Sequence, residues 1–192
     1  MVDYNPDRYG VVIAGLIGNK TMRDLGPARP DLAIREKLAQ FSAESLFAGR
    51  GIVDLEMAEC CLAALWMYHD FLDESHRLSQ QVYTHTGSYW HGIMHRREPD
   101  YPNAKYWFQR VGQHPIYPEL KEAVEQLHVA WDEVPPFLLR EVWDPAGFID
   151  LCEQSRGKND SMEKFCQTVQ QIEWQILFDY SFRKAIGWVE TE

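Results

Sequence analysis

The segment CCLAALWMY, residues 60–68, constrains the fold more than any other part of the chain. A helix with this sequence would be apolar on every side, which is typical of a helix buried in the middle of a domain. A chain of 192 residues that is 45% hydrophobic can supply the core around such a helix. The sequence therefore predicts a single domain, residues 1–192, built around a central helix.

Helix start and stop signals divide the rest of the chain. Asp31 stands where an N-cap would be, and Asp160 with Glu163 three residues later has the spacing of a capping box. Gly and Pro around VVIAGLIG predict an irregular arm with one short strand in residues 1–30. The predicted class is all-α, with about seven helices forming an irregular bundle in 31–192. We expect these helices at about 31–47, 53–81, 88–97, 103–112, 118–131, 145–155 and 160–187.

Charge limits the expected partners. The chain has 19 basic and 29 acidic residues, a net charge of −10. Nucleic acids and anionic membranes attract basic surfaces, so neither is expected to be a partner. No apolar run is long enough to span a bilayer, and the first residues lack a signal-peptide pattern. With four cysteines outside the spacing of zinc or redox motifs, these features predict a cytoplasmic protein with reduced thiols.

The end of the expected helix 53–81 carries polar residues on its buried face. At about 100° per residue, one face about 120° wide holds Leu62, Leu65, Trp66, His69, Leu72, Asp73, His76 and Gln80. A buried carboxylate or imidazole needs a partner, so such a face usually lines a cavity, a metal site or a polar network. We therefore take His69, Asp73 and His76 as candidate catalytic residues. The alternative is that the helix leaves the core after residue 68 and these side chains are solvated.

A second candidate region is the segment GSYWHGIMHRREPD, residues 87–100, and the helix expected after it. His91 and His95 are four residues apart, so a helix would place both on one face, as in half of a metal clamp. Gly92 stands where the zinc-protease motif has its glutamate, so that motif is excluded. The local excess of Arg and Lys suits an anionic ligand, and the alternative is ion pairing within the acidic chain. The candidate ligand-binding residues are His91, His95, Arg96, Arg97, Lys105, Arg110, Trp90 and Tyr106.

The run SYWHGIMHRREPDY followed by NAKYWFQRVGQHP resembles the signature of a family of uncharacterised, largely helical proteins. The likeness extends to HDFLDESHRLSQ and to QQIEWQILFDYSFRKA, and it covers most of residues 60–185. The family brings no assigned activity, cofactor or catalytic residue. The resemblance therefore implies a helical fold and a shared site, without implying a reaction.

Three hypotheses for function follow, and the sequence does not decide whether the protein is an enzyme. The first is a pocket for a small anionic metabolite between helix 53–81 and segment 88–112, with a histidine oriented by Asp73 as acid or base. The second is an enzyme with one zinc, iron or manganese ion, for which the candidate ligands are His69, Asp73, His76, His91 and His95. The third is a non-catalytic homodimer, in which the polar cluster is structural and the aromatic residues form an interface.

Overall fold

The computed structural model describes residues 4–18, 24–127 and 134–188. Within these ranges the chain forms ten α-helices and two 3-10 helices and contains no strand, which confirms the all-α class. The elements in order are η1 (Pro6–Tyr9), α1 (Val11–Ile17), α2 (Leu32–Leu38), α3 (Ala43–Leu46), α4 (Leu55–Tyr68), α5 (Leu72–Ser79), α6 (His85–Arg97), α7 (Tyr101–Val111), α8 (Tyr117–Glu125), η2 (Pro136–Leu139), α9 (Pro145–Ser155) and α10 (Ser161–Ala185).

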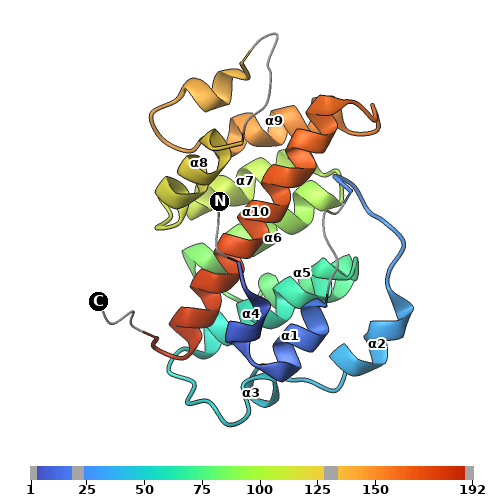
Figure 1. Cartoon of the computed structure of the whole chain (residues 1–192), viewed down its shortest axis with the longest axis vertical. Helices are drawn as coiled ribbons and strands as arrows, with labels where there is room; N and C mark the ends of the chain where they lie inside the picture. The colour runs from blue at the N-terminus through green and yellow to red at the C-terminus, as the bar shows by residue number, and fades with distance from the viewer. Residues whose placement is uncertain (1–3, 19–23, 128–133, 189–192) are drawn as a thin grey trace.

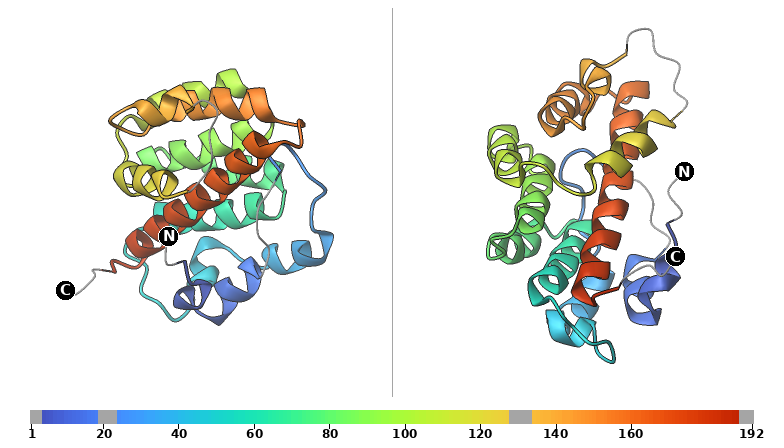
Figure 2. Two further views of the ribbon diagram at one scale, coloured as in Figure 1. Left: turned by 45° about the horizontal axis from the view of Figure 1, so that its top comes forward. Right: turned by 90° about the vertical axis from the view of Figure 1, so that its left-hand side faces the viewer.

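The longest helix, α10, runs through the middle of the molecule (Figure 1) and contacts α4, α8 and α9. In the right-hand view of Figure 2, α6 and α7 lie on one side of α10 and α1 lies on the other. Helix α5 packs on α6, and α6 packs on α7. No helix in the described ranges is both long and apolar enough to cross a membrane.

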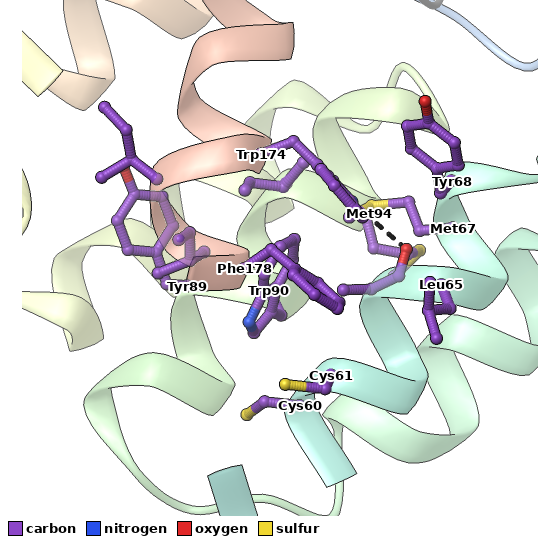
Figure 3. Packing of buried hydrophobic residues seen from close by; sticks show 14 of the residues in the cluster. Cys60, Cys61, Leu65, Met67, Tyr68, Tyr89, Trp90, Met94, Trp174 and Phe178 are labelled. Carbon is purple, nitrogen blue, oxygen red and sulfur yellow. Dashed lines mark hydrogen bonds between the residues drawn. The ribbon is translucent and has the colours of Figure 1, made fainter. Parts of the chain in front are cut away.

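Helix α4 is the buried central helix that the apolar segment predicts. All residues from Cys60 to Tyr68 are buried, and all four cysteines are free thiols within the core. Figure 3 shows side chains of α4, α6 and α10 meeting there, among them Leu65, Trp90 and Phe178. The indole nitrogen of Trp174 donates a hydrogen bond to the Ala64 carbonyl at 3.2 Å, so α10 is fixed to α4 by a polar contact within an apolar core.

The expected count of about seven helices is too low for three local reasons. The segment VVIAGLIG forms α1 instead of a strand. The expected helix 31–47 separates into α2 and α3, because Ser42 caps a new helix with its side chain on the Ser45 amide. The expected helix 53–81 separates into α4 and α5. Residues 128–131 of the expected helix 118–131 lie outside the described residues, whereas Pro145–Ser155 matches its expected range.

The break between α4 and α5 is a helix C-cap with aspartate in the place that glycine usually takes. Asp70 has a φ of 64°, in the left-handed region. Its amide donates to the Met67 carbonyl at 3.0 Å, and the Phe71 amide donates to the Trp66 carbonyl at 3.0 Å. These are the two hydrogen bonds of a Schellman motif, and the rings of Trp66 and Phe71 supply its apolar contact at 5.3 Å. The chain changes direction here, so His69 and His76 do not share a helical face.

Candidate metal site

Three histidines from two helices come together near the surface. His76 lies on α5, and His91 and His95 lie on α6. Each offers a ring nitrogen, and the three nitrogens lie within 4.8 Å of one another. In the described part of the chain, no other set of three or more His, Cys, Asp or Glu side chains meets this condition. We call His76, His91 and His95 the histidine cluster.

Local sequence explains how α6 presents two of these rings. Thr84 caps the helix by accepting a hydrogen bond from the Gly87 amide at 3.0 Å. The spacing of four residues then stacks the rings of His91 and His95 with centroids 4.7 Å apart and an interplanar angle of 18°. The third ring reaches them because α5 begins in a new direction after Asp70. The ring centroid of His76 lies 4.7 Å from that of His91 and 5.1 Å from that of His95.

Gly92, where a zinc protease would have glutamate, has a packing role. A Cβ atom at this position would lie 2.8 Å from the ring of Phe108, so only glycine allows α7 to approach α6 this closely. The close approach places the ring of Trp107 parallel to that of His91, with centroids 4.0 Å apart and an angle of 22°. Trp107 therefore forms one wall of the histidine cluster.

Burial keeps His91 and His95 neutral. His91 is 2% exposed and His95 is 5% exposed. The pKa of His91 is lowered to about 3, first by burial and then by the neighbouring His95 and His76. The pKa of His95 is lowered to about 4 by burial and by His76, against a smaller opposing effect of Asp100. At neutral pH each ring therefore carries a nitrogen lone pair that is free of a proton.

His91 differs from an ordinary buried histidine in its hydrogen bonding. Among the residues that the structure places, none is a hydrogen-bond partner of either Nδ1 or Nε2 of His91. Nearly all buried polar groups in proteins have a partner, so this ring needs an explanation. Its neighbours are aromatic: His76, His95 and Trp107.

Carboxylates and an amide border the cluster on the His95 side. Oε2 of Glu98 lies 3.4 Å from Nδ1 of His95, and Oδ2 of Asp100 lies 3.9 Å from it. The amide nitrogen of Asn103 lies 3.2 Å from Nε2 of the same ring. Burial and nearby carboxylates, Asp73 and Asp100, raise the pKa of Glu98, while His76 opposes them. The cluster thus has a negatively charged border.

Two of the five predicted metal ligands lie outside the cluster. His69 caps the end of α4 and is buried, where its Nε2 donates to the Leu16 carbonyl at 2.7 Å. Its Nδ1 lies 3.8 Å from Oδ2 of Asp31. Asp73 is exposed on the first turn of α5. The C-cap at Asp70 separates His69 from Asp73 and His76, because it ends the continuous helix on which all three residues would have shared one face.

The predicted ligand-binding cations mostly have carboxylate partners. Arg96 is fully buried and bonds to Glu173, which also accepts a hydrogen bond from Tyr89 at 3.0 Å. Arg97 pairs with Asp70.

The remaining predicted ligand-binding residues each make different contacts. Lys105 pairs with Asp150, and the guanidinium of Arg110 lies over the ring of Trp107 at 5.3 Å. Trp90 is buried, with its indole nitrogen donating to Ser181 at 3.1 Å, and Tyr106 is half exposed. The structure thus brings together His76, His91 and His95 and leaves the other predicted site residues around or away from them.

Sequence reasoning missed Trp107, Glu98 and Asp100 as parts of the site. The spacing His95-x-x-Glu98 places the carboxylate one helical turn from the imidazole, so this contact had a signal. No sequence signal indicates the contact of Trp107 with His91, because this contact depends on how closely Gly92 lets α7 pack against α6. Comparison of the chain with known proteins finds no matching family model, no match among curated proteins and no match among solved structures. The family resemblance noted in the sequence therefore stays a prediction.

Proposed function

We propose that the protein holds one divalent transition-metal ion with His76, His91 and His95 and acts as a metal-dependent enzyme. The observation that carries this proposal is His91, a buried imidazole between two other histidines whose ring nitrogens have no partner among the described residues. An unsatisfied buried polar group costs about 1–3 kcal/mol. A metal ion bound to one of the two nitrogens would satisfy that nitrogen.

The chemistry of the ligand set supports zinc or a similar ion. Neutral imidazole is a common ligand of zinc, iron and manganese, and the low pKa values of His91 and His95, about 3 and about 4, keep both rings available. Glu98 and Asp100 outside the His95 ring add negative charge, as the outer partners of metal-binding histidines commonly do. Both features favour a cation at this place.

The geometry requires a small contraction when the ion binds. Bonds of about 2.0–2.1 Å in a tetrahedral site place the ligand nitrogens about 3.3 Å apart, whereas the present nitrogens lie within 4.8 Å. The stacked rings of His91, His95 and Trp107 are held by packing. His76 is half buried on the short helix α5, and it has the freedom to move toward the ion.

Three protein ligands leave a position open for water or substrate. A zinc ion with such a position lowers the pKa of its bound water to about 7 and can polarise a carbonyl or phosphoryl oxygen. The exposed residues Asp73, Glu98 and Asp100 lie at the same border, so a ligand can approach from solvent. A hydrolytic or hydration reaction is therefore the class that the site supports best.

The contacts favour this hypothesis over a pocket for an anionic metabolite. Arg96, Arg97 and Lys105, three of the cations expected to hold such a ligand, are paired with carboxylates of the protein. The carboxylates of Glu98 and Asp100 border the His95 ring, and the guanidinium of Arg110 lies over Trp107. The homodimer hypothesis stays a prediction from the aromatic content of the sequence.

The direct test is elemental analysis by mass spectrometry of the untagged full chain, purified without nickel resin or chelator. We expect about one zinc, iron or manganese ion per chain, and its loss in His91→Ala and His95→Ala. The matched control is His85→Ala, because His85 is exposed on the same helix and lies outside the cluster. Wild-type protein that takes up none of these metals on dialysis, or a metal content that His91→Ala leaves unchanged, would contradict the proposal.

A further inference from the structure

A groove of about 730 Å³ shares Glu98 and Asp100 with the border of the histidine cluster. Its walls come from the chain around α2, from the start of α5 and from the turn between α6 and α7. Its lining combines apolar and charged side chains. The apolar lining residues are Pro27, Ala28, Pro30, Leu32, Phe71 and Leu72, and the charged lining residues are Arg35, Asp70, Asp73, Glu74, Glu98 and Asp100.

Only some of the acidic residues that line the groove form ion pairs with a Lys or Arg of the protein. Asp70 is bonded by Arg97. Glu74 is bonded by Arg35 at 2.9 Å, and among the described residues Arg35 is the one basic side chain that lines the groove. Asp73, Glu98 and Asp100 make no ion pair with a Lys or Arg in the described ranges. We call these three residues the groove carboxylates.

The groove carboxylates also border the histidine cluster. Glu98 and Asp100 lie 3.4 Å and 3.9 Å from Nδ1 of His95, and Asp73 precedes His76 by one helical turn on α5. His91 contacts both other rings and has no hydrogen bond to any described residue, but it does not line the groove. Glu98 and Asp100 line the groove and also border His95, so these two residues connect the groove to the histidine cluster.

We infer that this groove binds the substrate of the histidine cluster and that the substrate is an organic cation with an apolar body. The inference rests on the proposed metal-dependent function. The groove carboxylates attract an amidinium or ammonium group, and the low-dielectric apolar wall strengthens that attraction. Phe71, Leu72 and the prolines cover the uncharged part of the ligand. An anionic ligand of the same shape is repelled.

Three isosteric probes test the inference on the full chain loaded with zinc: benzamidine, benzamide and benzoate. Isothermal titration should give the tightest binding for the cation benzamidine, about five-fold or more tighter than for neutral benzamide. Benzoate should bind least. Binding of benzamidine should weaken as sodium chloride is raised, because salt screens exposed charges. Repeating the titrations on metal-free protein separates recognition by the groove from ligation of zinc by benzoate.

Charge-neutralising variants identify the residues responsible. Asp73→Asn and Glu98→Gln should each weaken benzamidine binding by about two- to five-fold and leave benzamide binding unchanged. The matched control is Glu122→Gln, an exposed carboxylate on α8 that does not line the groove. Benzoate binding as tight as benzamidine in metal-free protein, or unchanged benzamidine affinity in both groove variants, would overturn the inference.

Metal analysis of the same samples keeps the two proposals separate. If zinc binds at about one ion per chain and benzamidine shows no preference over benzamide, the groove inference is wrong and the metal proposal stands. If no metal binds, the proposed function is wrong, and the titration of metal-free protein still decides whether the groove selects a cation.

Discussion

His114 and His91 are both buried histidines, but they differ in the hydrogen bonds of their ring nitrogens. They are 3% and 2% exposed, and burial is the main cause that lowers the pKa of His114 to about 4 and that of His91 to about 3. Nε2 of His114 lies 3.1 Å from the Thr86 hydroxyl, and its Nδ1 accepts a hydrogen bond from the Ile116 amide at 3.4 Å. Both nitrogens of His91 lack any such bond to the residues that the structure covers.

A histidine with a structural role and a histidine that can bind a ligand differ in the partners of their ring nitrogens. The protein supplies polar partners for His114, so its ring completes the core. Around His91 it supplies other imidazoles and the ring of Trp107. Such a setting holds a ring in place and leaves its lone pair available, which is the condition for binding a metal ion. The two histidines can therefore be told apart by experiment.

The largest expected difference between the two is in stabilisation by zinc. A ligand at 1,000 times its Kd raises the free energy of unfolding by about 4 kcal/mol. His91→Leu should abolish this gain, whereas His114→Leu should retain it. Urea unfolding with and without zinc measures both. Equal zinc stabilisation of the two variants would show that the ion, if bound, lies elsewhere.

The next difference is in the stability of the metal-free protein. Here His114→Leu should have the larger effect and His91→Leu the smaller one. His114→Leu leaves the Thr86 hydroxyl and the Ile116 amide without their present partner, so the free energy of unfolding should fall by about 2–3 kcal/mol. His91→Leu keeps a side chain of similar volume and loses no hydrogen bond to any residue that the structure describes, so the loss should stay below about 1 kcal/mol. Urea unfolding in the presence of a chelator gives both values. A larger loss for His91→Leu than for His114→Leu would refute the distinction.

The smallest expected effect is on the pH dependence of stability. Because the pKa values of about 3 and about 4 in the folded state lie below about 6.5 for an unfolded histidine, the unfolded chain binds more protons. The free energy of unfolding therefore has its full value above pH ~6.5 and decreases as the pH drops toward 4. Each of His91, His95 and His114 should contribute about 1–2 kcal/mol of loss between pH 7 and pH 5. Metal-free His91→Leu should lose less stability than the wild type over this interval, and an unchanged loss would contradict the burial of this ring.

The sequence could predict features that depend on neighbouring residues. The burial of α4 follows from a segment that is apolar on every side. The caps at Asp31 and Asp160 follow from their side chains, which accept hydrogen bonds from the amides of Ala33 and Glu163. The pairing of His91 with His95 follows from their spacing of four residues.

Features that depend on distant packing or on an unusual backbone were not predictable. The C-cap at Asp70 lacks the glycine that would signal it, so the expectation that His69 shares a helical face with Asp73 and His76 is wrong. The partner of Arg96 is Glu173, 77 residues away in the chain. The meeting of His76 with His91 depends on the direction that α5 takes after the break.

Anomalous X-ray diffraction from zinc-soaked crystals of the full chain would show directly whether His76, His91 and His95 bind a metal ion. We expect one anomalous peak at the zinc edge, about 2.0–2.1 Å from a ring nitrogen of each of these histidines. We also expect the three nitrogens to move closer together than the present limit of 4.8 Å. A well-occupied zinc peak at another place, or a cluster with no peak at saturating zinc, would contradict the proposed metal site.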